Sequence, residues 1–408
     1  MWTWAERQME AKVLTTITAT LGPDSIKKVD DFTVDFTPRV TNNRIPEQIV
    51  HPEGAIVPRG NHFDTLPADG TGPFKVVDYR RKESVTLERN DAYWGTKPQV
   101  RRLSVRFLPD AQTRVEALRS GQVDFVMDLP ADATPSVESD SKLRVVRSRP
   151  GRNHLIYINK SGQPPHELGA EKAVREAVSL AIDRKAYTET VFEGNADPGR
   201  WMAPESVLGS SASLVAAIPY DPTRARTVLE NAGWKVGSDG IRTRDGKRLS
   251  LTLLGTSEIP ESSGQFLQAQ LKDVGIDVVI KKTPDTATRN TLYRAGDYTL
   301  DLEPPNQNDG NPAFLPVLRM ATRQPNTAQF APGGEFDVLA DRSLAVPTTA
   351  EVQQLAARMM KILINDEFIV VPVAGIYRIY GMSKSVRFTD PHPSQTNQTW
   401  FSLSKSAE

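Results

Sequence analysis

Histidines are the first residues to consider as metal ligands or general bases. The chain has five, which are His51, His62, His154, His166 and His392. No two stand four residues apart, the spacing that places two imidazoles on one helix face around a metal. His166-Glu167 also lacks the second histidine of the HExxH motif. The histidines therefore predict no metal site, and only His154 gains interest from its position in the chain.

Other catalytic and cofactor motifs are missing as well. The sequence has no GxSxG elbow, no P-loop and no GxGxxG, and Gly70-Thr71-Gly72 leads into a predicted strand, which favours a turn. The absence of cysteine excludes disulfides, thiolate metal sites and a cysteine nucleophile. Asp183-Arg184 are neighbours that point to different faces of a predicted helix, so ordinary ion pairing is expected. We expect no enzyme and no cofactor.

Charge argues against a nucleic-acid partner. The 50 basic and 50 acidic residues balance to zero. A short basic run of Arg144, Arg147, Arg149 and Arg152 has no interleaved aromatic residues, so it is predicted to be a solvated strand face. No apolar run reaches 18 residues, the length that indicates a membrane span.

The elements that must position any site follow an α/β pattern. A chain of 408 residues exceeds the roughly 250–300 residues that one core serves, so at least two lobes are expected. Apolar spacing and cap residues predict helices at 111–120, 170–192, 222–232 and 349–362. Asp245-Gly246 predicts a hairpin turn, and residues 368–373 predict a buried strand. Between them, alternation at 249–253, a helix at 266–274 and alternation at 276–280 predict a parallel crossover unit.

Several segments in order resemble one family. Residues 70–74 (GTGPF) and 87–95 (LERNDAYWG) are similar to the GTGPY and L.RN..YW.G signature of the family-5 extracellular solute-binding proteins of ABC transporters. Further resemblances in the same order are ALRSGQVD at 117–124, VREAVSLAIDR at 174–184, YDP at 220–222 and the segment 267–276. The resemblance extends over nearly the whole chain from residue 70 onward.

The resemblance implies a two-lobe periplasmic-binding-protein-like fold, type II, of the large peptide-binding class, with a small additional subdomain. We expect residues 1–70 to be the remnant of that subdomain, 71–150 and 376–408 to form a discontinuous lobe I, and 151–375 to form lobe II. The family's hinged lobes close over a ligand. The first passage between lobes is expected near 149–159, and the return passage after Val373.

The resemblance also implies where a ligand binds. Substrate-binding side chains are expected at Arg152, Asn153 and His154 on the first passage, at Trp201, and at Asn306, Asn308 and Asp309 in the loop after Pro304-Pro305. Asn308 aligns with an aspartate that peptide-binding relatives use for a peptide's α-ammonium, and the adjacent Asp309 can take over that charge. A zwitterionic or mixed polar solute is favoured over a bare cation.

The function implied is that of a receptor that captures a peptide or other small polar solute for a membrane permease of an ABC importer. A periplasmic or cell-surface location and a monomeric state go with this. Two alternatives stay open: a cytoplasmic solute-sensing regulatory domain of the same fold, and a hydrolase. The first residues, 1–7 (MWTWAER), contain no signal peptide, and the family's substantial first segment is not matched. Lobe I is therefore expected to have an incomplete sheet with an exposed edge, and the chain to be poorly stable.

Overall fold

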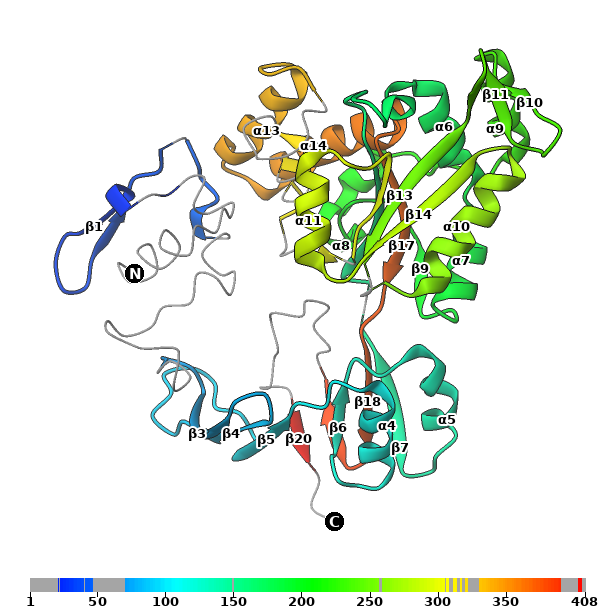
Figure 1. Cartoon of the computed structure of the whole chain (residues 1–408). Coiled ribbons are helices and arrows are strands. Elements are labelled where there is room, and N and C mark those ends of the chain that lie inside the picture. The colour runs from blue at the N-terminus through cyan, green and yellow to red at the C-terminus, as the bar shows by residue number, and fades with distance from the viewer. Residues whose placement is uncertain are drawn as a thin grey trace. The chain divides into compact units, whose positions relative to one another are not determined.

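The computed structural model describes residues 21, 23–39, 41–46, 70–148, 150–256, 259–304, 306–307, 311–313, 316–317, 320–321, 330–389 and 403–405. The chain divides into two compact units. Unit 1 comprises residues 1–149 and 378–408, and unit 2 comprises 150–377. Each unit is built from its own sheets and helices (Figure 1). The assignment of residues 1–70 to a separate subdomain stays a prediction.

Unit 2 is organised around a seven-stranded mixed sheet with the order β14-β13-β15-β8-β17-β9, in which β16 also pairs with β8. Its strands are β8 (Arg152–Ile158), β9 (Ala196–Pro198), β13 (Ser250–Thr256), β14 (Asp277–Thr283), β15 (Leu300–Leu302), β16 (Asn306–Gln307) and β17 (Val370–Ile376). A small second sheet contains β10 (Lys235–Val236), β11 (Arg242–Arg244) and β12 (Lys247–Arg248).

Helices cover both faces of the large sheet (Figure 1). They are η4 (Glu167–Ala170), α6 (Lys172–Ala181), α7 (Arg184–Val191), α8 (Glu205–Leu208), η5 (Gly209–Leu214), α9 (Pro222–Asn231), α10 (Glu261–Asp273), α11 (Thr286–Ala295), α13 (Glu335–Ala345), α14 (Thr349–Lys361) and the π-helical turn η6 (Ile362–Asp366). Strand β8 sends alternate side chains into the two cores, because successive residues of a strand point to opposite faces. Leu155 and Tyr157 join one core, and Ile156 and Ile158 the other.

Unit 1 contains three small sheets in the part of the chain after residue 70 that the structure describes. The first is the antiparallel meander of β3 (Phe74–Arg80), β4 (Ser84–Arg89) and β5 (Arg102–Arg106). The second has the order β6-β18-β7 and contains β6 (Phe125–Met127), β18 (Ile379–Ser383) and β7 (Leu143–Arg147). The third pairs β19 (Val386–Phe388) with β20 (Leu403–Lys405). The helices are α4 (Ala111–Arg119), η3 (Ala131–Ala133) and α5 (Thr134–Glu138). Nearer the N-terminus lie η1 (Pro23–Ser25) and the hairpin of β1 (Ile26–Lys28) with β2 (Val34–Phe36).

Most local signals in the sequence are confirmed. Asp221 caps α9 by accepting from the backbone N–H of Arg224, and Thr348 with Glu351 forms a complete capping box on α14. Strands β13 and β14 are parallel and joined by α10, as the crossover pattern predicts. The turn between β11 and β12 has positive φ at Asp245 (52°) and Gly246 (77°), as a tight hairpin requires.

The single helix expected over residues 170–192 is wrong. Ile182 is extended, with φ −92° and ψ 113°, so α6 ends there. Asp183 then caps α7, accepting from the N–H of Ala186 at 3.0 Å. The ion pairing expected for Asp183-Arg184 is corrected too, since buried Arg184 donates to the carbonyls of Pro372, Ser179 and Ile182.

A buried ion pair ties α11 to the central sheet. The Nε of Arg289 lies 2.8 Å from an Asp301 oxygen, and its Nη2 pairs with the other carboxylate oxygen. Both side chains are at most 1% exposed, and Glu303 lies 3.8 Å from the same guanidinium. Asp301 is the residue of β15 that pairs with Tyr157 of β8. This ion pair therefore fixes α11 against β15, the strand that pairs with β8.

Arg289→Met is expected to lower the free energy of unfolding by about 3–5 kcal/mol, because it leaves a buried carboxylate without its counter-charge. Arg358→Met is the matched control, since Arg358 pairs with Glu335 at 2.8 Å on the surface, where both side chains are largely exposed. Its cost should stay below about 1 kcal/mol. Urea denaturation followed by circular dichroism measures both, and equal losses would contradict the assigned role.

Candidate ligand-binding site

The site begins where the chain enters unit 2. On one side of β8, Arg152 and Asn153 pair with Gln307 and Asn306 of β16. On the other side they pair with Ile376 and Gly375 of β17. Two of the predicted site residues on β8 and a third on β16 are thus held at one end of the sheet by backbone pairing on both sides.

Asn153 attaches the segment that carries Trp201 to this end of the sheet. Its side chain is buried and donates to the carbonyl of Met202 at 2.8 Å. Gly199, two residues before Trp201, donates to the Val373 carbonyl at 2.9 Å. A Cβ at Gly199 would lie 2.6 Å from Val373 backbone atoms, so only glycine allows this approach. Asn153 therefore acts here as a support for the Trp201 segment.

Trp201 is half-buried and held on two sides. Its indole Nε1 donates to the Ala212 carbonyl at 3.1 Å. The guanidinium of Arg200 lies 4.7 Å from the centre of its ring, a cation–π distance. The indole is packed against the core that contains Leu155 and Tyr157 of β8. Trp201 thus has a fixed orientation close to Asn153.

His154 points into the core. It is fully buried, its Nδ1 lies 3.1 Å from the Tyr187 hydroxyl, and Phe192 packs edge-on against its ring. Burial is the main cause that lowers the pKa of His154 to about 3, and the positive charge of Arg152 lowers it further. The imidazole is therefore neutral in the folded protein near pH 7. Contact between His154 and a ligand stays a prediction, and the structure gives this side chain a packing role.

The remaining predicted residues are described only in part. Asn306 is placed by its backbone pairing with Asn153. Asn308 and Asp309 lie outside the described residues. Arg152, at the start of β8, is half-buried. The structure thus brings Arg152, Asn153, Trp201 and Asn306 to one end of the sheet, while the ligand contacts themselves stay predictions.

No sequence pattern predicted the contacts within unit 1 that hold together the two chain segments leading to unit 2. Ser148 and Arg378 exchange two bonds: the Ser148 N–H donates to the Arg378 carbonyl at 2.9 Å, and the Arg378 N–H to the Ser148 hydroxyl at 2.9 Å. The Arg378 guanidinium also binds both oxygens of Asp128, each at 3.0 Å. Asp128 has a positive φ of 53°, which no sequence motif marked. These contacts are non-local, so no spacing in the sequence could indicate them.

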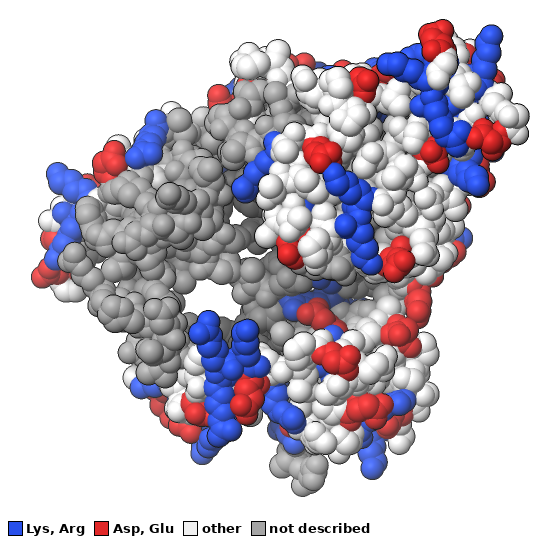
Figure 2. Space-filling view, viewed as in Figure 1, with Lys and Arg blue, Asp and Glu red and all other residues white. Residues whose placement is uncertain are grey.

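Among the residues that the structure describes, no group of three or more His, Asp or Glu side chains is placed to hold a metal ion. None of the described helices combines the length and apolar character that a membrane crossing needs. On the face shown in Figure 2, basic and acidic side chains of the described residues are interspersed, in keeping with the balanced charge.

Solved structures define the class to which this fold belongs. NikA from Brucella suis in complex with Fe(III)-EDTA superposes with a TM-score of 0.82 at 21% identity, covering 98% of this chain and 82% of that one. DppA from Helicobacter pylori in complex with the peptide STSA gives a TM-score of 0.77 at 22% identity, covering 99% of this chain and 81% of that one. The expected class, a type II periplasmic-binding-protein fold of the large peptide-binding group, is confirmed.

The family follows from the sequence match. Residues 2–323 match the model of the bacterial extracellular solute-binding proteins, family 5 Middle. The chain belongs to this family, as the ordered segments from residue 70 onward indicate.

Curated relatives are similar over part of their length. Protein XP55 of Streptomyces lividans is 29% identical over 60% of this chain and 44% of its own length. The oligopeptide-binding protein AppA of Bacillus subtilis is 30% identical over 53% of this chain and 40% of its own length. The nickel-binding periplasmic protein of Escherichia coli is 29% identical over 51% of this chain and 40% of its own length. This chain therefore spans less than half the length of these relatives.

The buried neutral His154 is expected to make stability depend on pH. Its pKa is about 3 in the folded chain and near 6.5 when unfolded, so the unfolded state binds more protons between these values. The contribution of neutral His154 to the free energy of unfolding is fully present above pH 6.5 and is lost as the pH falls toward 3. About 2 kcal/mol should be lost between pH 7.5 and pH 5.

His154→Gln keeps a hydrogen-bonding group near Tyr187 and removes the titration. The difference in unfolding free energy between the wild type and this variant should shrink by the same amount from pH 7.5 to pH 5, as measured by urea denaturation. A difference that is constant across this range would show that His154 is not held neutral by the fold.

Proposed function

We propose that this chain is the solute-binding receptor of an ABC importer, which captures a peptide or other small polar solute and delivers it to a membrane permease without changing it chemically. The observation that carries the proposal is the family match over residues 2–323. Relatives named for oligopeptide and nickel binding support a transport role. A location outside the cytoplasmic membrane is part of the same proposal.

We assign ligand binding to the end of the unit 2 sheet where β8 begins. Arg152 offers a guanidinium fork suited to a carboxylate, and Trp201 offers apolar area. Both stand on backbone that is anchored by strand pairing or by the Asn153–Met202 hydrogen bond. Anchored backbone favours binding, since less conformational entropy is lost when ligand binds. Asn306, Asn308 and Asp309 are proposed to complete the polar side.

A solute with a carboxylate fits this arrangement best, and a peptide has one at its C-terminus. A metal chelate with carboxylate arms presents the same group. The first experiment is therefore a thermal-shift screen of peptides of two to five residues, their C-terminal amides, and nickel–histidine complexes. No shift with any of them would argue against both ligand classes.

Arg152→Ala is expected to weaken the tightest carboxylate-bearing solute from this screen by about 1–3 kcal/mol, because a charged hydrogen bond is lost. The same variant should bind the corresponding C-terminal amide as the wild type does. Isothermal titration calorimetry measures both. Arg224→Ala is the control, since Arg224 lies on α9 and pairs with Glu176 on the surface. Equal affinity of wild type and Arg152→Ala for the carboxylate form would remove Arg152 from the site.

A further inference from the structure

The large sheet of unit 2 ends on an open strand. β14 is the first strand in the sheet order, and among the described residues it pairs with β13 alone (Figure 1). Val279 is 54% exposed and Ile280 is 38% exposed, so the middle of this strand is accessible. Two strands, β13 and β15, separate β14 from β8, so this edge lies apart from the candidate site. An accessible edge strand is a template for another strand.

The backbone bonds of β14 show which groups reach the open edge. The N–H of Asp277 donates to the Leu249 carbonyl at 2.9 Å. In a strand, every second residue bonds to the same neighbour, so the odd-numbered residues of β14 bond to β13. The backbone groups of the even-numbered residues therefore point away from β13. The Val278 carbonyl has this direction, because it accepts from the side-chain amide of Gln268 on α10 at 2.7 Å.

The odd-numbered side chains of β14 have a self-complementary order. Asp277, Val279 and Lys281 share one face of the strand, because alternate residues of a strand point to the same side. An acid, an apolar residue and a base thus follow one another along the edge. An antiparallel second copy presents the same three residues in reverse. With Val279 opposite Val279 of the second copy, each Asp277 lies opposite a Lys281.

Backbone and charge together select this register. The even-numbered residues carry the outward backbone groups, so they must lie opposite one another to exchange hydrogen bonds. In this register Val278 lies opposite Ile280 of the second copy. The Val278 carbonyl already accepts from Gln268, and its second lone pair is left for the N–H of that Ile280. A shift by two residues in either direction places a charged side chain opposite Val279 and leaves it without a counter-charge.

Both charged residues keep capacity for a further contact. Lys281 pairs with Asp297 at 2.6 Å, and its side chain is 40% exposed. Asp277 accepts from Ser250 at 2.9 Å and from Arg248 at 3.3 Å, both at Oδ2, and its side chain is 35% exposed. Lysines on an edge strand commonly oppose pairing with another chain. Here an antiparallel second copy supplies the opposite charge.

We propose that two copies of this chain form a dimer by pairing β14 with β14, antiparallel and centred on Val279. The contact is isologous, so both copies contribute the same residues. A single edge strand is small beside the roughly 800 Å² that each partner buries in a standard interface, so the dimer forms at high protein concentration. The proposal goes beyond solute binding and differs from the monomeric state that the family resemblance implies.

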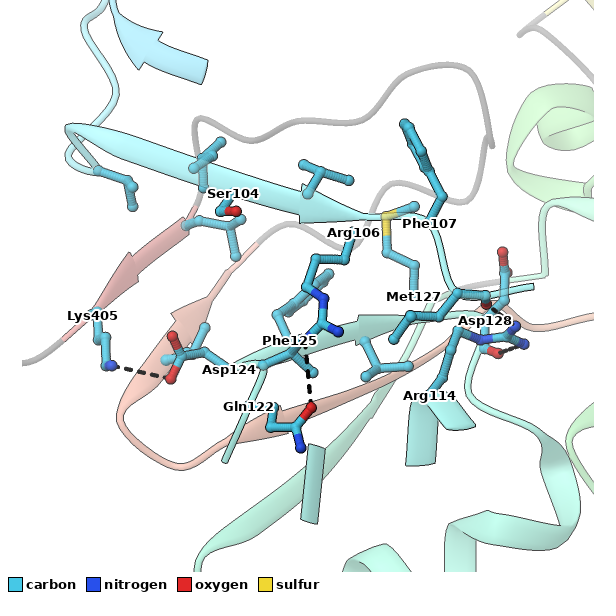
Figure 3. Close-up of a pocket in the computed structure, with 18 of the residues that line it drawn as sticks. Ser104, Arg106, Phe107, Arg114, Gln122, Asp124, Phe125, Met127, Asp128 and Lys405 are labelled. Atoms are coloured by element: carbon cyan, nitrogen blue, oxygen red, sulfur yellow. Dashed lines mark hydrogen bonds and ion pairs between the residues drawn. The ribbon is translucent and has the colours of Figure 1, made fainter. Parts of the chain in front are cut away.

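Unit 1 offers a different route to self-association. A cavity of about 820 Å³ there is lined by β5 and β6, with Val105 and Phe125 among its apolar side chains (Figure 3). Arg106 donates to the Gln122 side chain at 3.4 Å beside it. Among the described residues, β5 pairs with β4 alone and β6 with β18 alone. Copies joined through these strands would leave β14 unpaired, so the test must report on residue 279 itself.

A cysteine at the centre of the contact is that report, because the chain contains no other cysteine. Val279→Cys should form a disulfide-linked dimer under mild oxidation. Residues directly opposite in a pair without hydrogen bonds have Cα atoms about 4.5 Å apart, which a disulfide can bridge. Ile280→Cys is the matched control. Its counterpart in the second copy is displaced by about 7 Å along the strand, too far for a disulfide, so it should stay uncrosslinked.

Charge exchange tests the register. Asp277→Lys and Lys281→Glu each place like charges opposite one another, so each alone should weaken dimerisation by at least about ten-fold in sedimentation velocity. An equimolar mixture of the two variants should dimerise again, because the lysine introduced in one copy then faces the glutamate introduced in the other. Recovery on mixing also requires that both variants are folded. Lys185→Glu is the control, since Lys185 is a largely exposed residue of α7, and it should dimerise as the wild type does.

Three results overturn the proposal. The first is a wild-type chain that stays monomeric up to about 500 µM. The second is association that neither charge variant weakens, which would assign the contact to another surface such as the edges of β5 and β6. The third is oxidation that links Ile280→Cys as readily as Val279→Cys.

Discussion

The position of β8 in the middle of its sheet is the constraint on which unit 2 depends. β15 and β16 pair with one edge of this strand and β17 with the other, while its alternate side chains enter two separate cores. With both edges and both faces occupied, a shift of β8 by one residue would exchange its two apolar faces and break every pairing. The start of β8, where the candidate site lies, is therefore positioned by the whole of unit 2.

Polar side chains buried next to β8 hold the candidate site in place. Arg289 and Asp301 hold α11 against β15, and the Asn153 amide holds the Trp201 segment. Removing the Arg289–Asp301 pair from water is costly. We infer that the pair serves to fix α11 in one position against β15 as much as to stabilise the fold. A binding side chain on rigid backbone is positioned precisely. Little free energy is then spent on ordering that side chain when the ligand binds. We infer that these buried contacts maintain the geometry that Arg152 and Trp201 present.

Prediction from sequence worked where the signal was local. The caps at Asp221 and Thr348 and the parallel crossover need only nearby residues, and they are confirmed. The break at Ile182 was missed, because apolar residues keep the helical spacing up to it and Asp183 was assigned to ion pairing and not to a cap. The assignment of His154 to the ligand site stays a prediction, and no sequence signal showed that its side chain is buried beside Tyr187. The direction of the His154 side chain depends on the pairing of β8 with β16 and β17. These strands are distant in the sequence, so no local pattern predicts it.

The proposed function requires that the chain binds a solute and leaves it unchanged. Its most direct test is to saturate the purified protein with the solute found by the thermal-shift screen, incubate it for hours, and recover the solute by denaturation for mass spectrometry. With solute present in excess, we expect the recovered solute to have the same mass and the same amount at every time point. Steady conversion to a product of different mass, in excess of the protein, would contradict the claim and assign the chain to the hydrolases.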